Sequence, residues 1–344
     1  MALMVLESAD ELIALEPNAL VARLQAFVAD TAFSQDLKRA YAPNSLRTAG
    51  ADWRIWCEFC RRTQRTALPA TSDSLRQFLT ERISAGRARA TLDHYLWTLG
   101  LVHRLGDLPW PLSTEGGRLM WRGLRRQLPK RQNQKHGLVL DEVDQVIGAM
   151  GDSPVDVRDA AMLSIASETL ARPSDLVALA VEHVTFNRNG TGRVLFVRSK
   201  TDQEAEGAIA AISVETARRT RRWIEHADLT KGALFRSIPV VAKPRTREPL
   251  PGLYAWPLST RDVQRIYKRR AAVVGLDWKN ISGHSPRVGS AQDLMAAGFS
   301  GPQIQQQGRW KSERMVLRYS EHLRADRGAM AQLLARRRER KPPG

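Results

Sequence analysis

The stretch GHSPRVGS, residues 283–290, places a histidine and an arginine three positions apart around a proline. Serine is favoured at the N-cap of a helix and proline at its first position, so we expect a helix that begins at Pro286, with Ser285 as its N-cap. Arg287 then lies in the first turn, where the positive end of the helix dipole disfavours a cation unless an anion is bound there. Arg287 and His284 are therefore candidates to bind a phosphate, although a surface arginine beside a core histidine would give the same local pattern.

A second stretch, ETLARPSDL, repeats this arrangement earlier in the chain. Arg172 precedes a proline and an expected helix, and Asp175 follows the arginine by three positions. Further residues of chemical interest are Lys200, at the end of an expected strand, and the aromatic residues Trp310 and Tyr319 in GRWKSERMVLRYS.

Together these side chains meet the needs of phosphoryl transfer without a metal ion or other cofactor. Two guanidinium groups can hold the oxygens of a phosphodiester in its transition state, and fixed donors provide most of such catalysis. A tyrosine can act as a covalent nucleophile, but its pKa near 10 requires a proton acceptor, which a neutral histidine or a nearby carboxylate could be. A lysine can protonate the departing oxygen, and a tryptophan offers an indole N–H.

The charge of the chain points to a polyanionic partner. Among its 344 residues, Lys and Arg exceed Asp and Glu by 17. Nucleic acid is the commonest such partner, with an anionic membrane surface as the alternative. No apolar run of about 18 residues is present to span a bilayer, and the N-terminal MALMVLESADEL reaches acidic residues too early for a secretion signal. We therefore expect a cytoplasmic protein with no membrane partner.

The first 130 residues have the pattern of a small helical bundle. Apolar residues recur three and four apart, and turn signals separate four expected helices at 45–63, 73–85, 88–106 and 114–128. The only cysteines, Cys57 and Cys60, form a C-x-x-C pair that invites a redox or zinc interpretation. With Trp53 and Trp56 they instead make one apolar helical stripe, and no second ligand pair completes a zinc site, so we expect core packing.

The helix expected at 114–128 is basic on one side. Its arginines lie three and four apart, whereas Leu119, Leu124 and Leu128 can face inward. With almost no compensating acid, this run favours phosphate contact over a solvated face, and two arginines at the start of another helix are weaker candidates. These candidate phosphate-contacting residues are Arg118, Arg122, Arg125, Arg126, Arg87 and Arg89.

A polar and basic segment at 129–137 reads as a linker to a second domain at 138–344. That domain is expected to be helix-rich, with a β-hairpin formed by 192–199 and 206–213 and an irregular loop at 237–257. The later helices are expected at 214–226, 259–274, 286–298, 311–319 and 326–338.

Taken together, these motifs resemble the tyrosine recombinase (phage integrase) family. The likeness is carried by GHSPRVG, by LSTR at 258–261, by SKTDQEAEG at 199–207 and by the ending GAMAQLL at 328–334, and it extends over nearly the whole chain from about residue 20. It implies that Tyr319 is the nucleophile, that Arg172 and Arg287 clamp the phosphate and that Lys200 is the general acid.

The resemblance implies roles for other positions as well. His284 matches the histidine of the His-x-x-Arg box, and Trp310 matches a position that is His or Trp in the family. Asp175 matches an acidic position three residues after the first arginine. Arg261 matches an arginine that contacts DNA.

For the fold, the resemblance implies a mainly α protein with a small β-hairpin or sheet in the catalytic domain. A helical core DNA-binding domain at 1–130 and the catalytic domain would form a two-domain, C-shaped clamp on DNA. The implied activity is site-specific recombination through a 3′-phosphotyrosyl intermediate and a Holliday junction, with neither metal nor ATP. The resemblance also implies that the protein is encoded by a bacterium, a phage or a plasmid and that it associates with the nucleoid.

The implied partners are a double-stranded site with inverted-repeat arms and further copies of this chain, four of which would assemble on two sites. The helix at 326–338 would dock into a neighbouring subunit through Met330, Leu333 and Leu334, although packing on its own domain is the alternative.

Other function classes remain open. A type IB topoisomerase or telomere resolvase would share many of the same site residues. An accessory or catalytically silent DNA-binding protein would keep the phosphate-binding residues but would not cleave DNA. A metal-dependent nuclease is poorly supported, because no cluster of carboxylates lies among the basic residues.

Overall fold

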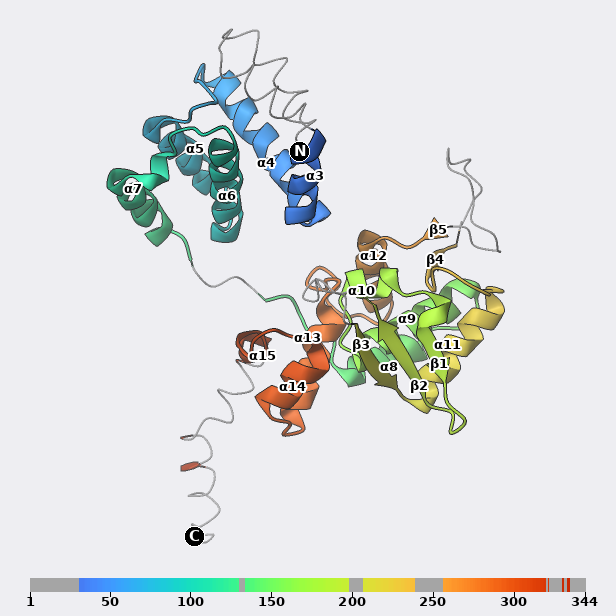
Figure 1. Ribbon diagram of the computed structural model, residues 1–344. Helices are drawn as coiled ribbons and strands as arrows, with labels where there is room; N and C mark the ends of the chain where they lie inside the picture. Colours follow the sequence, from blue (N-terminus) through green and yellow to red (C-terminus); the bar gives the residue numbers. More distant parts are fainter. Residues whose placement is uncertain are drawn as a thin grey trace, which may run out of the picture. The chain divides into compact units, whose positions relative to one another are not determined.

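The computed structural model describes residues 31–129, 134–197, 207–238 and 256–319, together with residues 321, 330, 333 and 334. The chain divides into two compact units, Met1–Asn133 and Gln134–Gly344 (Figure 1). No helix among the described residues is both long and apolar enough to cross a membrane.

Unit 1 is helical throughout its described part. Its elements are α3 (Thr31–Ala40), α4 (Pro43–Arg62), α5 (Ser72–Ser84), α6 (Arg89–Leu105), the 3-10 turn η1 (Pro111–Ser113) and α7 (Glu115–Arg126). The four expected helices are confirmed as α4 to α7, whereas α3 was not expected. Threonine caps fix two of the helix starts, because Thr71 accepts the N–H of Ser74 at 3.1 Å and Thr114 accepts that of Gly117 at 3.1 Å.

The stripe on α4 packs into the core of unit 1, as expected. Cys57 and Cys60 are buried thiols, not joined in a disulfide, beside Trp53 and Trp56, and burial, with the neighbouring Cys57, raises the pKa of Cys60 to about 12. The ring of Trp56 meets that of Phe78 edge to face at 5.2 Å. These cysteines therefore act as small apolar side chains.

A buried histidine joins α6 to the turn before α5. His103 accepts the backbone N–H of Ala70 through Nε2 at 2.9 Å, which leaves the ring proton on Nδ1 to be donated to the carbonyl of Leu99 at 2.7 Å. Burial lowers the pKa of His103, so the folded unit holds the ring neutral.

Unit 2 is mainly α with two small antiparallel sheets, which confirms the expected fold class. Its helices are α8 (Leu140–Gly148), α9 (Pro154–Glu168), α10 (Pro173–Ala178), the 3-10 turn η2 (Val181–His183), α11 (Val214–His226), α12 (Thr260–Val273), α13 (Ser285–Ala296), α14 (Gly301–Gly308) and α15 (Arg314–Tyr319). Its strands are β1 (Val184–Phe186), β2 (Gly192–Phe196), β3 (Ala208–Ile212), β4 (Arg236–Ser237) and β5 (Trp256–Pro257).

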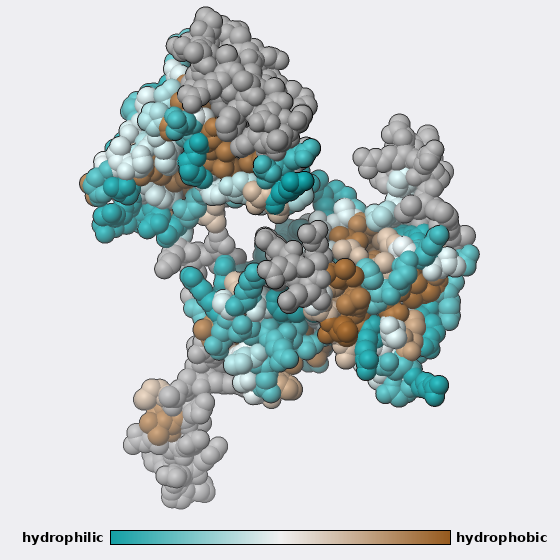
Figure 2. Space-filling view, in the orientation of Figure 1, coloured by the Kyte–Doolittle hydropathy of each residue, from teal (hydrophilic) through white to brown (hydrophobic). Residues whose placement is uncertain are grey.

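The expected hairpin is present as β2 and β3, which pair antiparallel with Leu195 opposite Ile209. Strand β1 adds to the other edge of β2, so the sheet has the order β1-β2-β3. The view in Figure 2 is mainly hydrophilic, with hydrophobic residues gathered in the region of β2 and β3, where Leu195 and Ile209 are exposed. The expectation of an irregular loop at 237–257 is wrong at its ends, because β4 pairs with β5 there, and 239–255 lie outside the described residues.

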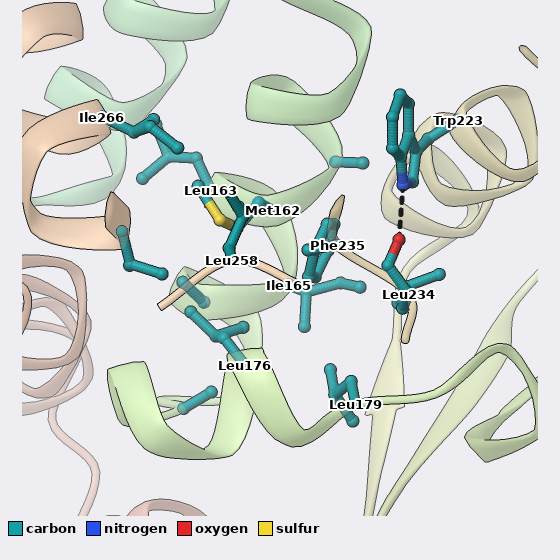
Figure 3. Packing of buried hydrophobic residues seen from close by; sticks show 14 of the residues in the cluster. Met162, Leu163, Ile165, Leu176, Leu179, Trp223, Leu234, Phe235, Leu258 and Ile266 are labelled. Atoms are coloured by element: carbon teal, nitrogen blue, oxygen red, sulfur yellow. Dashed lines mark hydrogen bonds between the residues drawn. The ribbon is translucent and has the colours of Figure 1, made fainter. Parts of the chain in front are cut away.

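Helix α9 is the centre of the core of unit 2. Side chains from α9, α10, α11 and α12 converge around Met162 and Ile165, and the indole of Trp223 donates to the carbonyl of Leu234 at 2.8 Å (Figure 3). Because α9 is buried on nearly all sides, its end fixes the position of the ARPSDL motif that follows it.

A buried charge network fastens α12 to α9. Asp159 is fully buried and accepts from Arg158 on its own helix at 2.6 Å. From α12 it accepts Arg269 at 2.9 Å and Arg270 at 2.8 Å. One carboxylate thus serves three guanidinium groups, which satisfies its oxygens in a place that water does not reach.

The segment that enters unit 2 lies along α13. The N–H of Leu138 donates to the carbonyl of Ser285 at 2.9 Å, and the N–H of Leu140 donates to Asp293 at 2.7 Å. A methyl group on Gly289 would lie 1.8 Å from the carbonyl oxygen of Leu138, so glycine is required for this contact. Residues 134–137 of the expected linker belong to unit 2 by their contacts.

Candidate active site

The GHSPRVGS motif begins its helix one residue earlier than expected. Helix α13 starts at Ser285, and His284 is the N-cap with φ −94° and ψ −3°. Ser285 is therefore not the cap; its hydroxyl instead accepts the N–H of Ser282 at 2.9 Å within the turn before the helix. This turn holds Ser285 in helical geometry although proline follows it, against the usual restriction.

The two arginine motifs pack directly together. A methyl group on Gly283 would lie 2.7 Å from Cγ of Pro173, so the turn before α13 lies against the start of α10. Arg172 is the N-cap residue of α10, and Arg287 lies in the first turn of α13. The structure thus brings together the residues that the two short motifs singled out.

Arg287 is buried and held at both ends of its guanidinium fork. Nη1 donates to the carbonyl of Leu170 and Nη2 to the carbonyl of Gly308. Burial and the neighbouring Arg172 and Arg309 lower the pKa of Arg287 to about 9, against the opposing influence of Asp175 and Tyr319. A buried cation surrounded by like charges is a place where a bound anion is strongly favoured.

Arg172 retains a donor that the described residues do not use. Its Nη2 donates to the carbonyl of Arg309 at 3.3 Å, and its backbone N–H donates to Asp175 at 3.1 Å. Its Nη1 is buried and lies 3.7 Å from Asp175 Oδ2, with no hydrogen-bond partner among the described residues. This N–H group can therefore bind an oxygen of a ligand.

Trp310 links the arginines to Tyr319. The guanidinium carbon of Arg287 lies 4.1 Å from the centre of the Trp310 ring, and the Trp310 and Tyr319 rings are 5.8 Å apart. Tyr319 is half-buried at the end of α15, where its carbonyl accepts from Gln292 of α13 at 3.1 Å. A small apolar cluster with Leu170 and Val316 supports both rings.

His284 is exposed at the start of α13, and its backbone N–H donates to Ser282 at 3.2 Å. It is thus exposed to solvent, three positions before Arg287 in the chain, where a proton acceptor can exchange with solvent. Lys200 lies outside the described residues.

One residue of the site, Arg309, was not predicted from the sequence. Arg309 follows α14 with φ 53°, and its Nη2 lies 3.6 Å from Asp175 Oδ2. Its guanidinium carbon is 4.1 Å from the centre of the Phe196 ring, and burial lowers its pKa. The sequence carried no usable signal, because GRWKS gives no hint of a left-handed arginine.

The candidate DNA-contacting arginines are mostly exposed. Arg261 is exposed in the first turn of α12, and Arg87 is exposed before α6, where the partly buried Arg89 lies 3.8 Å from Asp93. On α7, Arg118 and Arg122 are exposed and Arg125 is partly buried.

One expectation about α7 is wrong. Leu119 is 53% exposed, because Met120 and Leu124 occupy the inward positions. The single acid of this segment, Glu115, lies 2.9 Å from Arg118 and 3.8 Å from Arg122. Within the described residues, no group of three or more His, Cys, Asp or Glu side chains is placed to hold a metal ion.

The model of the phage integrase family matches residues 137–325, more than half of the chain, and this span contains every catalytic candidate. The chain belongs to the phage integrase family. It is similar to the recombinase Cre of Escherichia phage P1, with 28% identity over 315 residues that cover 86% of this chain and 89% of Cre. It also matches an integrase/recombinase XerD homologue of Selenomonas ruminantium, with 24% identity over 83% of each chain.

A solved family member shows the same fold. A XerH site-specific recombinase bound to a palindromic difH substrate, in a post-cleavage complex, gives a TM-score of 0.58 at 13% identity and covers 81% of this chain and 78% of its own. At this identity the likeness concerns the fold.

Proposed function

We propose that this chain is a site-specific recombinase that cleaves and rejoins DNA through a covalent bond between Tyr319 and a 3′-phosphate. The observation that carries the proposal is the grouping of two buried arginines, Arg172 and Arg287, with Trp310 and Tyr319 in unit 2. Fixed positive charge beside a phenol is what transfer of a phosphodiester to tyrosine requires.

In the proposed cleavage step, Tyr319 Oη attacks the phosphorus and the bond to the 5′-oxygen breaks. The free Nη1 of Arg172 binds one non-bridging oxygen. Arg287 carries five N–H donors, of which two already donate to carbonyls, so others remain for the second oxygen. Their charge stabilises the transition state, in which negative charge accumulates on these oxygens.

Proton transfers complete the step. The phenol proton passes to His284 rather than to Asp175, because Asp175 is buried, its Oδ2 faces Arg172 and Arg309, and its Oδ1 accepts from Ser174. Lys200 donates a proton to the leaving 5′-oxygen. The 5′-hydroxyl of a partner strand then attacks the phosphotyrosine, which restores Tyr319 and joins the strands. Because the phosphotyrosyl bond conserves the energy of the phosphodiester, neither ATP nor a metal ion is needed.

DNA is the partner that this chemistry requires. In the proposal, unit 1 is the core-binding domain, its exposed Arg118 and Arg122 contact phosphates, and Arg261 contacts DNA beside the catalytic residues. Two recombining duplexes with inverted-repeat arms would carry four copies of the chain, joined through the segment at 326–338. Met330, Leu333 and Leu334 are exposed, which is compatible with docking into a neighbouring copy.

The proposal is tested by covalent trapping. Nicked duplexes tiled across the DNA that flanks the gene are incubated with the protein, and SDS-resistant adducts are mapped to the nucleotide. The wild-type chain should form an adduct, and Tyr319→Phe should bind the same duplex without forming one. Tyr267→Phe is the matched control, because this buried tyrosine has a hydroxyl without a partner among the described residues; it should form the adduct normally.

Two results would contradict the proposal. An adduct in Tyr319→Phe would exclude Tyr319 as the nucleophile. A wild-type chain that binds a duplex specifically but never forms an adduct would instead be a catalytically silent DNA-binding protein.

A further inference from the structure

Arg309 has a backbone conformation that arginine rarely adopts. It follows the last residue of α14 with φ 53° and ψ 45°, in the left-handed region. Helices often end this way, but on glycine, because a β-carbon disfavours the conformation. A partly buried arginine kept in a strained position indicates that its side chain has a task there.

The carbonyl groups around Arg309 already hold the catalytic arginines. The carbonyl of Gly308 accepts from Arg287, and the carbonyl of Arg309 accepts from Arg172 at 3.3 Å. Both carbonyls lie at the C-terminal end of α14, where the helix dipole is negative and favours cations. Of positions 308 and 309, only 308 requires glycine, because a methyl group on Gly308 would lie 2.0 Å from the Trp310 ring.

The side chain of Arg309 reaches the carboxylate that Arg172 also faces. Asp175 Oδ2 lies 3.6 Å from Arg309 Nη2 and 3.7 Å from Arg172 Nη1, and it accepts the backbone N–H of Arg172 at 3.1 Å. On its other side, the Arg309 guanidinium lies over the ring of Phe196 at the end of β2. Asp175 is thus shared between two guanidinium groups, and neither ion-pair distance is short enough for a good hydrogen bond.

The net charge of the cluster changes with the presence of Arg309, which shares Asp175 with Arg172. Arg172, Arg287 and Arg309 with Asp175 carry a net charge of +2. Without Arg309 the net charge would be +1, and the carboxylate would face Arg172 alone. Oppositely charged groups this close form a bidentate pair readily, and such a pair would occupy the Nη1 donor of Arg172.

We propose that Arg309 is a positioning residue for strand cleavage. It holds Asp175 away from a full ion pair with Arg172 and thereby leaves Arg172 Nη1 to the scissile phosphate. This role rests on the proposed function, because it presupposes that Arg172 binds the phosphate that Tyr319 attacks.

The test uses a substitution that suits the left-handed backbone conformation of Arg309. Arg309→Gly removes the guanidinium and keeps a residue that adopts φ 53° without strain, so the α14 carbonyls stay in place. Single-turnover cleavage of the nicked duplex trapped by the wild-type chain is measured beside DNA affinity and thermal stability. We expect cleavage to slow by about ten- to a hundredfold, with affinity and stability unchanged, because a displaced catalytic donor reduces the rate by such factors.

A second substitution separates charge sharing from packing. Asp175→Asn added to Arg309→Gly restores the net charge of +2 and removes the competing carboxylate, while the amide oxygen can still accept the N–H of Arg172. The double variant should cleave faster than Arg309→Gly alone. Asp228→Gly is the backbone control, because this exposed residue has φ 48° after α11 and lies outside the site; its cleavage rate should be that of the wild type.

The inference is overturned by cleavage at the wild-type rate in Arg309→Gly, or by a loss that weaker DNA binding or lower stability explains fully. It is also overturned if the double variant is no faster than the single one. Formation of the adduct by the wild-type chain in the same experiment shows that the proposed function itself stands; without it, both proposals fail.

Discussion

The guanidinium of Arg287 lies face-on to the indole of Trp310, with 4.1 Å between its central carbon and the ring centre. The same indole is 5.8 Å from the ring of Tyr319. Trp310 therefore lies near both the proposed phosphate-binding cation and the proposed nucleophile, and its packing bears on the positions of both. A cation over an indole is also stabilised electrostatically, more so where water is excluded.

Trp310→Ala should slow strand cleavage by about tenfold or more, because a small displacement of a reacting group has effects of this size. It should also lower the free energy of unfolding by about 3–5 kcal/mol, as truncation of a buried aromatic usually does. Trp310→Phe keeps an aromatic ring near Arg287 and Tyr319, so its cleavage rate and its stability should fall less. Single-turnover cleavage and urea unfolding measure the two effects. Equal cleavage rates in the wild type and both variants would show that Trp310 has no role in cleavage.

Asp159→Asn should destabilise unit 2 by about 3–5 kcal/mol, because it leaves the buried Arg158 without its anion and removes the charge that Arg269 and Arg270 of α12 share. Urea unfolding measures the effect. The control is Asp152→Asn, since this side chain is 84% exposed and lies 2.6 Å from Arg222. An exposed pair contributes about 0–1 kcal/mol, so a similar loss in both variants would contradict the assignment.

The stability of unit 1 should depend on the ionisation of His103. Its pKa is lowered in the folded chain by burial. Below the ordinary histidine pKa of about 6.5, the unfolded chain therefore binds a proton that the folded chain does not, and stability falls as the pH drops.

His103→Gln can keep both hydrogen bonds but cannot titrate. The difference in free energy of unfolding between wild type and variant should be constant near neutral pH and change by up to about 1.4 kcal/mol per pH unit below about pH 6. Chemical unfolding across this range tests it, and a difference that stays flat to about pH 5 would show that His103 does not titrate between the two states.

Arg122→Ala should weaken binding to many DNA sequences and reduce the slope of log affinity against log salt by about 0.9, the value for one phosphate contact. Arg218→Ala is the control, because this arginine of α11 has a similar exposure, 61% against 54%. Binding titrations at several salt concentrations measure both slopes. An unchanged slope for Arg122→Ala would indicate that the basic face of α7 is solvated and that Arg122 does not contact a phosphate.

Strand cleavage should persist in excess EDTA, because buried arginines supply the charge that a metal ion supplies in other phosphoryl-transfer enzymes. Adduct formation with and without EDTA measures it. A requirement for added Mg²⁺ would point to a different mechanism.

The local chemistry of the arginine motifs could be predicted from the sequence, because proline and N-cap preferences act over a few residues. Helix α10 begins at Pro173 as expected, and α13 begins within one residue of expectation. The error at Ser285 arose because its hydroxyl bonds to the turn before it, a contact that pattern alone does not reveal.

The contacts between the motifs could not be predicted in this way. Arg309 and Asp175 lie more than a hundred positions apart in the sequence, and only the tertiary fold brings the C-terminal end of α14 close to the start of α10. Likewise, the spacing of leucines on α7 allowed Leu119 to face inward, but Met120 filled that space. Amphipathic spacing thus defines a face only to within about one position.

The contact between the entering segment and α13 has a mechanical consequence. Leu138 is hydrogen-bonded to Ser285, and Gly289 leaves no gap between the two backbones. Tension applied to the chain at residue 134 is met first by the bond from His136 to the carbonyl of Asn280 and next by the bond from Leu138 to Ser285. A pull from the preceding chain is therefore transmitted to the first turn of the helix that carries Arg287 within a few residues of its point of application.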